Sequence, residues 1–119
     1  MQGARTERVA QVVREALAEA LAYGEIKDPR VQSSGLLTVT HVRVSGDLRH
    51  AKVYVVATGG DAKEAVAGLR SAAGFLRGLV AERLATKATP ELSFFVDDEF
   101  EQAQKVERLL HDIESEGNK

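Results

Sequence analysis

The chain has 119 residues and a formal net charge of -2, and it contains neither cysteine nor tryptophan. A chain of this length is expected to form one domain around one core. Without cysteine it can have no disulfide framework, no thiolate nucleophile and no cysteine-ligated metal site.

The charge is unevenly distributed along the chain. Residues 41–90 contain eight basic and four acidic residues, a net charge of +4, whereas residues 91–119 contain three basic and nine acidic residues, a net charge of -6. The basic middle indicates a polyanionic partner, and the acidic end indicates a solvated helix or tail. No apolar run approaches the roughly 20 residues of a membrane span, and early charges such as Arg5 and Glu7 argue against a signal peptide. We expect a cytoplasmic protein.

Residues 5–23 are expected to form the first helix. Apolar side chains recur at three- and four-residue spacing from Val9 to Ala20, the pattern of an amphipathic helix. Gly24 is well placed to end this helix in a left-handed conformation. The proline at position 29 keeps the preceding residue out of helical geometry, so we expect an ordered loop that continues to Gly35.

Two strands follow this loop. Residues 36–44 and 50–56 are rich in β-branched side chains, which predicts an antiparallel pair joined by a short turn. The apolar alternation changes phase near Thr40 and His41, which indicates a β-bulge. In the second strand Tyr54 lies on the face opposite to the apolar, core-facing positions.

A long apolar pattern between residues 65 and 84 predicts helical structure, and Asp61 is expected to cap its start. Three glycines lie inside the pattern: Gly68, Gly74 and Gly78. Because each glycine costs about 1 kcal/mol relative to alanine inside a helix, two helices joined by a kink are favoured over one straight helix. The kink is expected at residues 72–74, where the side chains are smallest.

Residues 92–96 predict a third strand, and a last helix begins near Asp98 with acids that suit its N-terminal dipole. Five residues form the apolar stripe of this helix: Phe100, Ala103, Val106, Leu110 and Ile113. Residues 115–119 are expected to fray.

The predicted order is helix, strand, strand, helix, kink, helix, strand, helix. This order indicates a single α+β domain over residues 1–114, with a three-stranded sheet and helices packed on one face. Because no unusually large exposed apolar stripe is predicted, we expect a monomer.

Catalytic features are weak. His41, His50 and Asp47 could come together across the strand pair as a small metal or acid–base site, but their spacing follows no metal-ligand pattern. Asp97 and Asp98 form a carboxylate pair, but they stand where a helix N-terminus needs capping groups.

The predicted kink is the better candidate for a functional surface. Lys63, Arg70 and Arg77 are seven residues apart and lie on nearly one stripe. Turns lined by glycine and alanine let a sugar–phosphate backbone approach closely, and nearby arginines add positive charge. The alternative is that Gly74 and Gly78 only permit tight helix–sheet packing. Aromatic residues are few and most are expected to face the core, so a sheet with exposed aromatic rings of the RNA-recognition type is not expected.

Several segments taken together are specific for one known family. They are residues 27–30 (KDPR), 37–40 (LTVT), 51–53 (AKV), 71–77 (SAAGFLR) and 90–92 (PEL). With these segments the chain resembles the bacterial ribosome-binding factor A family from residue 8 to about residue 110. The resemblance implies a KH-like fold of the type II topology, in which an Ala-x-Gly kink replaces the usual GxxG loop. Ala72-Ala73-Gly74 matches that kink.

The resemblance also implies a non-catalytic function without a cofactor. Members of this family bind the free 30S small ribosomal subunit, contact its 16S rRNA, promote late maturation including 16S rRNA 5′-end processing, and support growth in the cold. No membrane and no small-molecule substrate is expected as a partner. The expected RNA-binding residues are Arg70, Ala72, Ala73, Gly74 and Arg77 at the kink, Arg49 and Lys52 at the second strand, and Arg5, Arg8, Lys27, Arg30 and Lys87.

Two other function classes stay open. One is a protein–protein interaction module that uses the acidic last helix or an open sheet edge. The other is the small enzyme based on His41, His50 and Asp47.

Overall fold

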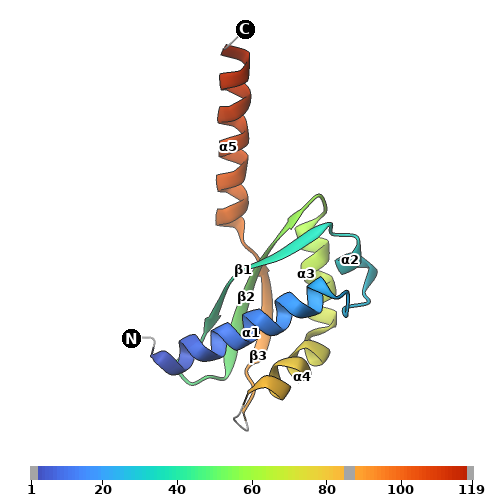
Figure 1. Cartoon of the computed structure of the whole chain (residues 1–119), viewed down its shortest axis with the longest axis vertical. Coiled ribbons are helices and arrows are strands. Elements are labelled where there is room, and N and C mark those ends of the chain that lie inside the picture. Colours follow the sequence, from blue (N-terminus) through green and yellow to red (C-terminus); the bar gives the residue numbers. More distant parts are fainter. Residues whose placement is uncertain (1–2, 85–87, 118–119) are drawn as a thin grey trace.

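The computed structural model describes residues 3–84 and 88–117 of the chain. The expected α+β order is confirmed, with one short additional helix before the first strand (Figure 1). The elements are α1 (Ala4–Ala22), α2 (Pro29–Gln32), β1 (Leu36–Val44), β2 (His50–Thr58), α3 (Ala62–Ser71), α4 (Ala73–Arg83), β3 (Glu91–Val96) and α5 (Asp98–Gly117).

The three strands form one mixed sheet in the order β1-β2-β3. β1 and β2 are antiparallel, as predicted, whereas β2 and β3 are parallel. The predicted bulge is confirmed, because the register between β1 and β2 shifts between Val39 and His41. Since β2 is the central strand, β1 and β3 are both edge strands.

The core lies between one face of the sheet and the helices α1, α3 and α4. Its largest fully buried side chains include Leu17 from α1, Leu69 from α3, Leu76 from α4 and Phe94 from β3. These residues belong to one continuous apolar cluster with the inward-facing residues of β1 and β2. Burial of such side chains away from water is the main favourable term in folding.

The connection between α1 and β1 is more ordered than a simple loop. Gly24 has a φ of 62°, and the amide of Glu25 donates to the carbonyl of Ala20 at 2.9 Å, which ends α1 as predicted. Asp28 has extended backbone angles and its side chain accepts from the amide of Arg30, so it caps the single helical turn α2. The sequence pattern missed this turn because four residues are too short for a helical period.

The predicted kink is present between α3 and α4. Ala72 ends α3 with φ of -94° and ψ of 6°, and α4 begins at Ala73 without a capping side chain. Asp61 caps the start of α3 by accepting from the amides of Lys63 and Glu64.

The expectation that all helices pack on the sheet is wrong for α5, which projects away from the domain (Figure 1). Phe100, Val106, Leu110 and Ile113 of its apolar stripe are each more than 40 % exposed. The argument for a monomer from the lack of an exposed apolar stripe therefore no longer holds. The helix also continues through residues 115–117, for which fraying was expected, and residues 118–119 lie outside the described part. None of the described helices is long and apolar enough to cross a membrane.

Candidate nucleic-acid interface

The start of α4 presents a surface without side chains. Gly74 and Gly78 are exposed, and beyond the adjacent helix backbone a Cβ added at either position would meet no atom of the described residues within 4 Å. Because they are four residues apart, both lie on one face of the helix. The alternative that these glycines permit tight helix–sheet packing is therefore wrong. The two glycines instead leave open space in front of the backbone.

The third glycine has the opposite role. A Cβ at Gly68 would lie 2.7 Å from Cγ2 of Val31 and 3.1 Å from Oδ1 of Asp28. The absence of a side chain therefore lets α2 lie directly against α3. Arg30 continues this contact, because its Nη2 donates to Oγ of Ser71 at 2.9 Å, next to the kink.

Asp28 and Arg30 form a local ion pair that holds α2 in place. The Arg30 guanidinium donates to both carboxylate oxygens of Asp28, at 3.0 and 2.7 Å. These hydrogen bonds, together with that from the Arg30 amide, lower the pKa of Asp28 from 3.8 to about 2. Asp28 and Arg30 therefore hold α2 against the end of α3, next to the kink. The resemblance indicated RNA binding for Arg30 and did not indicate this structural role.

Arg70 and Arg77 flank the kink and are both attached to backbone carbonyls near β3. Nη2 of Arg70 donates to the carbonyl of Phe94 at 2.9 Å, on the outer edge of β3. Nε and Nη2 of Arg77 donate to the carbonyl of Thr89 at 3.3 and 2.8 Å. A guanidinium has five N–H donors, so each arginine has donors beyond those used here. These contacts hold the guanidinium groups at β3 and at the segment before it, and both side chains remain exposed.

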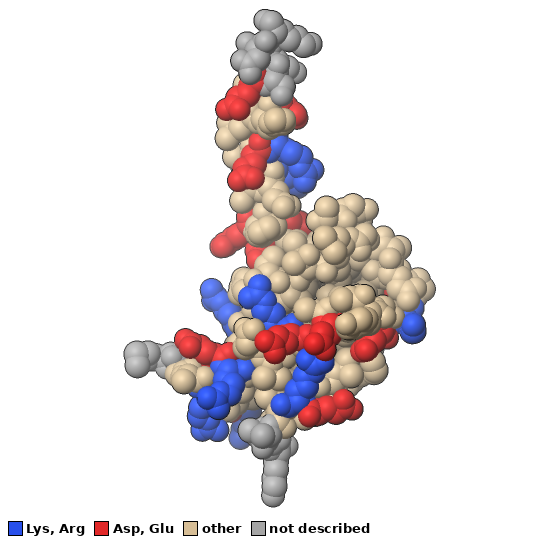
Figure 2. Space-filling view, in the orientation of Figure 1, with Lys and Arg blue, Asp and Glu red and all other residues tan. Residues whose placement is uncertain are grey.

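The other predicted basic residues do not form one patch with the kink. Arg5 and Arg8 are exposed near the N-terminal end of α1, where Figure 2 shows blue side chains gathered. Lys27 lies beyond the opposite end of this 19-residue helix, about 28 Å away at 1.5 Å per residue. Its Nζ donates to the carbonyl of Gly24 at 3.1 Å. Lys87 lies outside the described residues.

Arg49 and Lys52 lie at the hairpin end of the sheet, and both are exposed. The amide of Arg49 donates to Asp47 Oδ1 at 3.1 Å, and its carbonyl accepts from the amide of Glu91 at 2.8 Å. Lys52 stands directly opposite Arg43 in the antiparallel pair. These residues belong to the sheet, not to the kink surface.

The expectation that most aromatic residues face the core is wrong. Phe94 is the one buried aromatic side chain in the described part of the chain, and Phe75, next to Gly74, is 50 % exposed. His41, Tyr54 and Phe95 lie side by side on the sheet face opposite to the core. The outward position of Tyr54 was readable from the strand alternation, whereas the alignment with Phe95 requires the parallel register of β3.

The three residues of the enzyme hypothesis are not brought together. His41 pairs with Tyr54, whereas His50 lies four residues before Tyr54 in β2, about 13 Å away at 3.3 Å per residue. Asp47 accepts from the hydroxyl of Ser45 at 2.6 Å. Within residues 3–84 and 88–117 no three His, Cys, Asp or Glu side chains are arranged to hold a metal ion.

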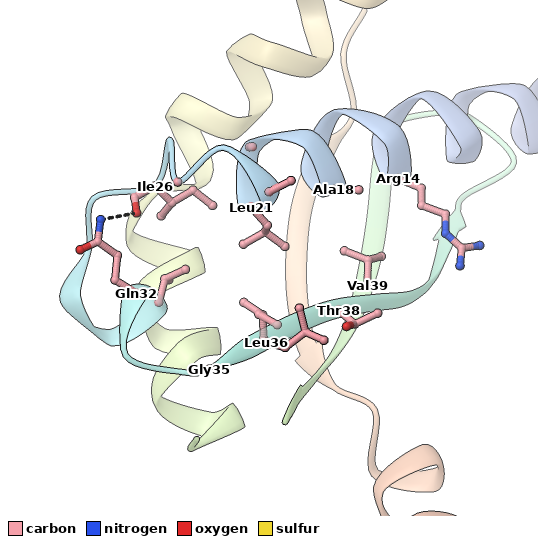
Figure 3. Close-up of a pocket in the computed structure, with 14 residues that line it drawn as sticks. Arg14, Ala18, Leu21, Ile26, Gln32, Gly35, Leu36, Thr38 and Val39 are labelled. Atoms are coloured by element: carbon pink, nitrogen blue, oxygen red, sulfur yellow. Dashed lines mark hydrogen bonds between the residues drawn. The ribbon is translucent and has the colours of Figure 1, made fainter. Parts of the chain in front are cut away.

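A hollow of about 660 Å³ lies between the C-terminal half of α1, α2 and edge strand β1 (Figure 3). Apolar residues such as Leu21, Ile26, Leu36 and Val39 line it, with Arg14 at one end. Its described lining contains no carboxylate and no histidine, so these residues provide no acid–base pair for catalysis.

Comparisons with known proteins agree with this architecture. A family model described as ribosome-binding factor A matches residues 5–110. Ribosome-binding factor A of Rhodopseudomonas palustris (strain BisB5) is 46 % identical over 107 residues, which cover 89 % of this chain and 78 % of that protein. The protein of the same name from Acaryochloris marina is 40 % identical over 116 residues, which cover 96 % of this chain and 83 % of that protein.

Solved structures show the same likeness. The crystal structure of ribosome-binding factor A from Thermus thermophilus has a TM-score of 0.63 and 31 % identity, over 76 % of this chain and 94 % of that one. A Thermus thermophilus homology model fitted into the cryo-electron microscopy map of a 30S–RbfA complex has a TM-score of 0.57 and 33 % identity, over 71 % of this chain and 86 % of that one. The chain belongs to the ribosome-binding factor A family.

Proposed function

We propose that this chain is a non-catalytic assembly factor that binds the free small ribosomal subunit through 16S rRNA and promotes late maturation of that subunit. The open surface at Gly74 and Gly78 is the observation that carries the proposal. A phosphate backbone can reach the α4 backbone there without displacing any side chain. Arg70 and Arg77 flank the kink in the sequence, and the guanidinium donors that their contacts with Phe94 and Thr89 leave free suit contact with phosphate.

The comparisons support the choice of partner. The name of the family refers to ribosome binding, and a homologue has been fitted into a map of a 30S complex. A contact made mainly to phosphate and ribose reads the shape of rRNA more than its sequence. Such a factor would favour one rRNA arrangement over competing ones, which matters most in the cold, where misfolded RNA helices persist. Processing of the 16S rRNA 5′ end, importance for growth in the cold and a cytoplasmic location belong to this proposal.

Sedimentation of a cell extract tests the proposed function directly. The chain should travel with free small subunits and be absent from intact ribosomes. Depletion of the protein should cause 16S rRNA with an unprocessed 5′ end to accumulate, more strongly at low temperature. Sedimentation with intact ribosomes, or an unchanged 5′ end after depletion, would contradict the assembly role.

A second candidate function is favoured by α5 and by the β1 edge. The exposed apolar stripe of α5 lies among acids such as Glu107 and Asp112, which suits a basic protein partner. Edge strand β1 borders the apolar hollow and could pair with an added strand. A protein–protein module predicts association that survives nuclease treatment of the partner, whereas the rRNA function predicts its loss.

A further inference from the structure

The sheet face opposite to the helices has a row of three aromatic rings, one from each strand. His41 of β1 stands opposite Tyr54 of β2, and Tyr54 stands opposite Phe95 of β3. The His41 and Tyr54 rings are stacked, with centres 4.3 Å apart and planes inclined by 15°. The Tyr54 and Phe95 rings have centres 5.6 Å apart. We call His41, Tyr54 and Phe95 the aromatic row.

The aromatic row is accessible. The core helices α1, α3 and α4 pack against the other face of the sheet, and α5 projects away (Figure 1). The side chain of His41 is 42 % exposed, and Tyr54 and Phe95 are partly exposed. Partly exposed aromatic rings forgo some of the benefit of burial, so a row of them on this sheet face is a candidate binding surface.

Positive charge lies beside the row. Arg43 and Lys52, two residues away along β1 and β2, face each other on the same side of the sheet and are both exposed. Two like charges directly opposite each other are unfavourable in an antiparallel pair. No acidic side chain in the described part of the chain forms an ion pair with either of them. An external anion between Arg43 and Lys52 would remove their repulsion.

Arg70 connects this face to the kink. Its guanidinium lies at the outer edge of β3, with Cζ 6.0 Å from the centre of the Phe95 ring and Nη2 on the carbonyl of Phe94. The same side chain comes from the last turn of α3, directly before the kink. Arg70 therefore offers positive charge at the β3 edge, between the kink and the aromatic row. A polyanion that contacts the kink can continue past Arg70 to the row.

The carboxylate of Asp97 lies next to the row. Asp97 Oδ2 is 3.5 Å from Nδ1 of His41 and accepts from the Thr40 hydroxyl at 2.6 Å. Its other oxygen accepts from the amide of Phe100 at 3.1 Å. Asp97 is thus engaged at the end of β3 and does not neutralise the cations at Arg43 and Lys52.

We propose that the aromatic row is a second RNA-binding surface, on which unpaired bases stack while Arg43 and Lys52 hold the adjoining phosphates. Aromatic rings beside a basic groove are the usual means of holding single-stranded RNA, because every base has a flat face that can stack. This inference rests on the proposed function for its RNA partner. It adds single-stranded segments to the sugar–phosphate backbone contacts expected at the kink.

Tyrosine fluorescence gives a direct test in the folded full chain. The chain has two tyrosines and no tryptophan, so in the variant Tyr23→Phe all emission comes from Tyr54. Oligoadenylate of about eight nucleotides, within the site sizes of single-strand binders, should quench this emission as it binds. A duplex RNA with the same number of phosphates should quench it much less. Unchanged emission with saturating oligoadenylate would overturn the proposal.

Variants then measure the contribution of the row. Tyr54→Leu should weaken oligoadenylate binding by about 5- to 150-fold, the loss expected for one stacked base, while duplex binding changes little. Tyr54→Phe keeps the ring and should keep the affinity. Tyr23→Leu is the matched control, because Tyr23 is 77 % exposed at the end of α1, away from the row. An equal loss for duplex RNA, or a loss with Tyr54→Phe as large as with Tyr54→Leu, would refute base stacking.

The stacking surface and the proposed function can fail independently of each other in these experiments. If the wild-type chain fails to bind small subunits but still binds oligoadenylate through Tyr54, the assembly role is wrong and the stacking surface stands. If the chain binds subunits but Tyr54→Leu leaves oligoadenylate binding unchanged, the stacking surface is wrong. If Tyr54→Leu instead weakens capture of RNA-free small-subunit proteins, the face is a protein-docking surface and the proposal is overturned.

Discussion

The three glycines of α3 and α4 should respond in opposite directions to the same substitution. Inside a helix, alanine is favoured over glycine by about 0.5–1 kcal/mol when its methyl group has room. At Gly78 a Cβ meets no atom of the described chain within 4 Å beyond the adjacent helix backbone, so Gly78→Ala should raise the free energy of unfolding by this amount. Gly74→Ala should have a smaller effect of the same sign, because Gly74 is in the first turn of α4.

At Gly68 the same methyl group has no room. It would lie 2.7 Å from Cγ2 of Val31, which is buried and β-branched and therefore cannot turn away without displacing α2. Overpacking of this kind costs about 1–3 kcal/mol. After subtraction of the helix preference for alanine, Gly68→Ala should lower the free energy of unfolding by about 1 kcal/mol.

Urea unfolding followed by the circular dichroism of the helices measures both changes in the free energy of unfolding. The slope of this free energy against urea concentration should be the same for all variants. For a domain of this size, 1 kcal/mol also corresponds to a shift of about 4–8 °C in Tm. Gly78→Ala and Gly68→Ala serve as controls for each other, because both remove glycine from a helix interior. If Gly68→Ala stabilised the chain as much as Gly78→Ala, the close contact of α2 with α3 would be refuted. If Gly78→Ala destabilised it, the surface of α4 would not be open.

Three further predictions concern pH, salt and α5. Because the pKa of Asp28 is lowered from 3.8 to about 2 in the folded chain, its ion pair stabilises the fold above pH 3.8, and this contribution should be lost as the pH falls towards 2. In Asp28→Asn the free energy of unfolding, measured by urea unfolding at each pH, should depend less on pH between 3.8 and about 2. The same pH dependence as in the wild type would contradict the role of the pair. Binding to small subunits should weaken steeply as salt rises, because phosphate contacts release counterions, and a flat salt response would argue against an rRNA contact. Truncation after Glu101 should leave the urea midpoint nearly unchanged, since residues 102–114 are all exposed. A clear loss of stability in the truncated chain would mean that α5 packs on the domain.

Local features of the fold could be predicted from the sequence because each depends on a few neighbouring residues. The kink at Ala72 follows from the cost of three glycines in one helical pattern, and the bulge near Thr40 follows from a change of phase within β1. The position of α5 could not be predicted in this way. An amphipathic period identifies the apolar stripe but does not specify what covers it, and here the stripe of α5 is exposed.

The candidate site was predictable in part. Residues 72–74 were identified by glycine cost and by family resemblance, but only Gly74 is exposed, whereas Ala72 and Ala73 are partly buried against the core. This difference is visible only once the helix is placed in the fold. The attachments of Arg70 and Arg77 to β3 and to Thr89 join residues 12 or more positions apart, which no local pattern reveals. The aromatic row depends on the registers of three strands and was missed for the same reason.

The measurement that tests the central claim most directly is cosedimentation of purified small subunits with the double variant Gly74→Gln, Gly78→Gln. Glutamine is a better helix former than glycine and carries no charge, so the variant should fold at least as stably as the wild type while its side chains fill the open surface of α4. Ala18→Gln, at an exposed position of α1, is the control for the added bulk. We predict that the double variant loses small-subunit association and that Ala18→Gln retains it. Full association of the folded double variant would contradict the claim that rRNA approaches the chain at the kink.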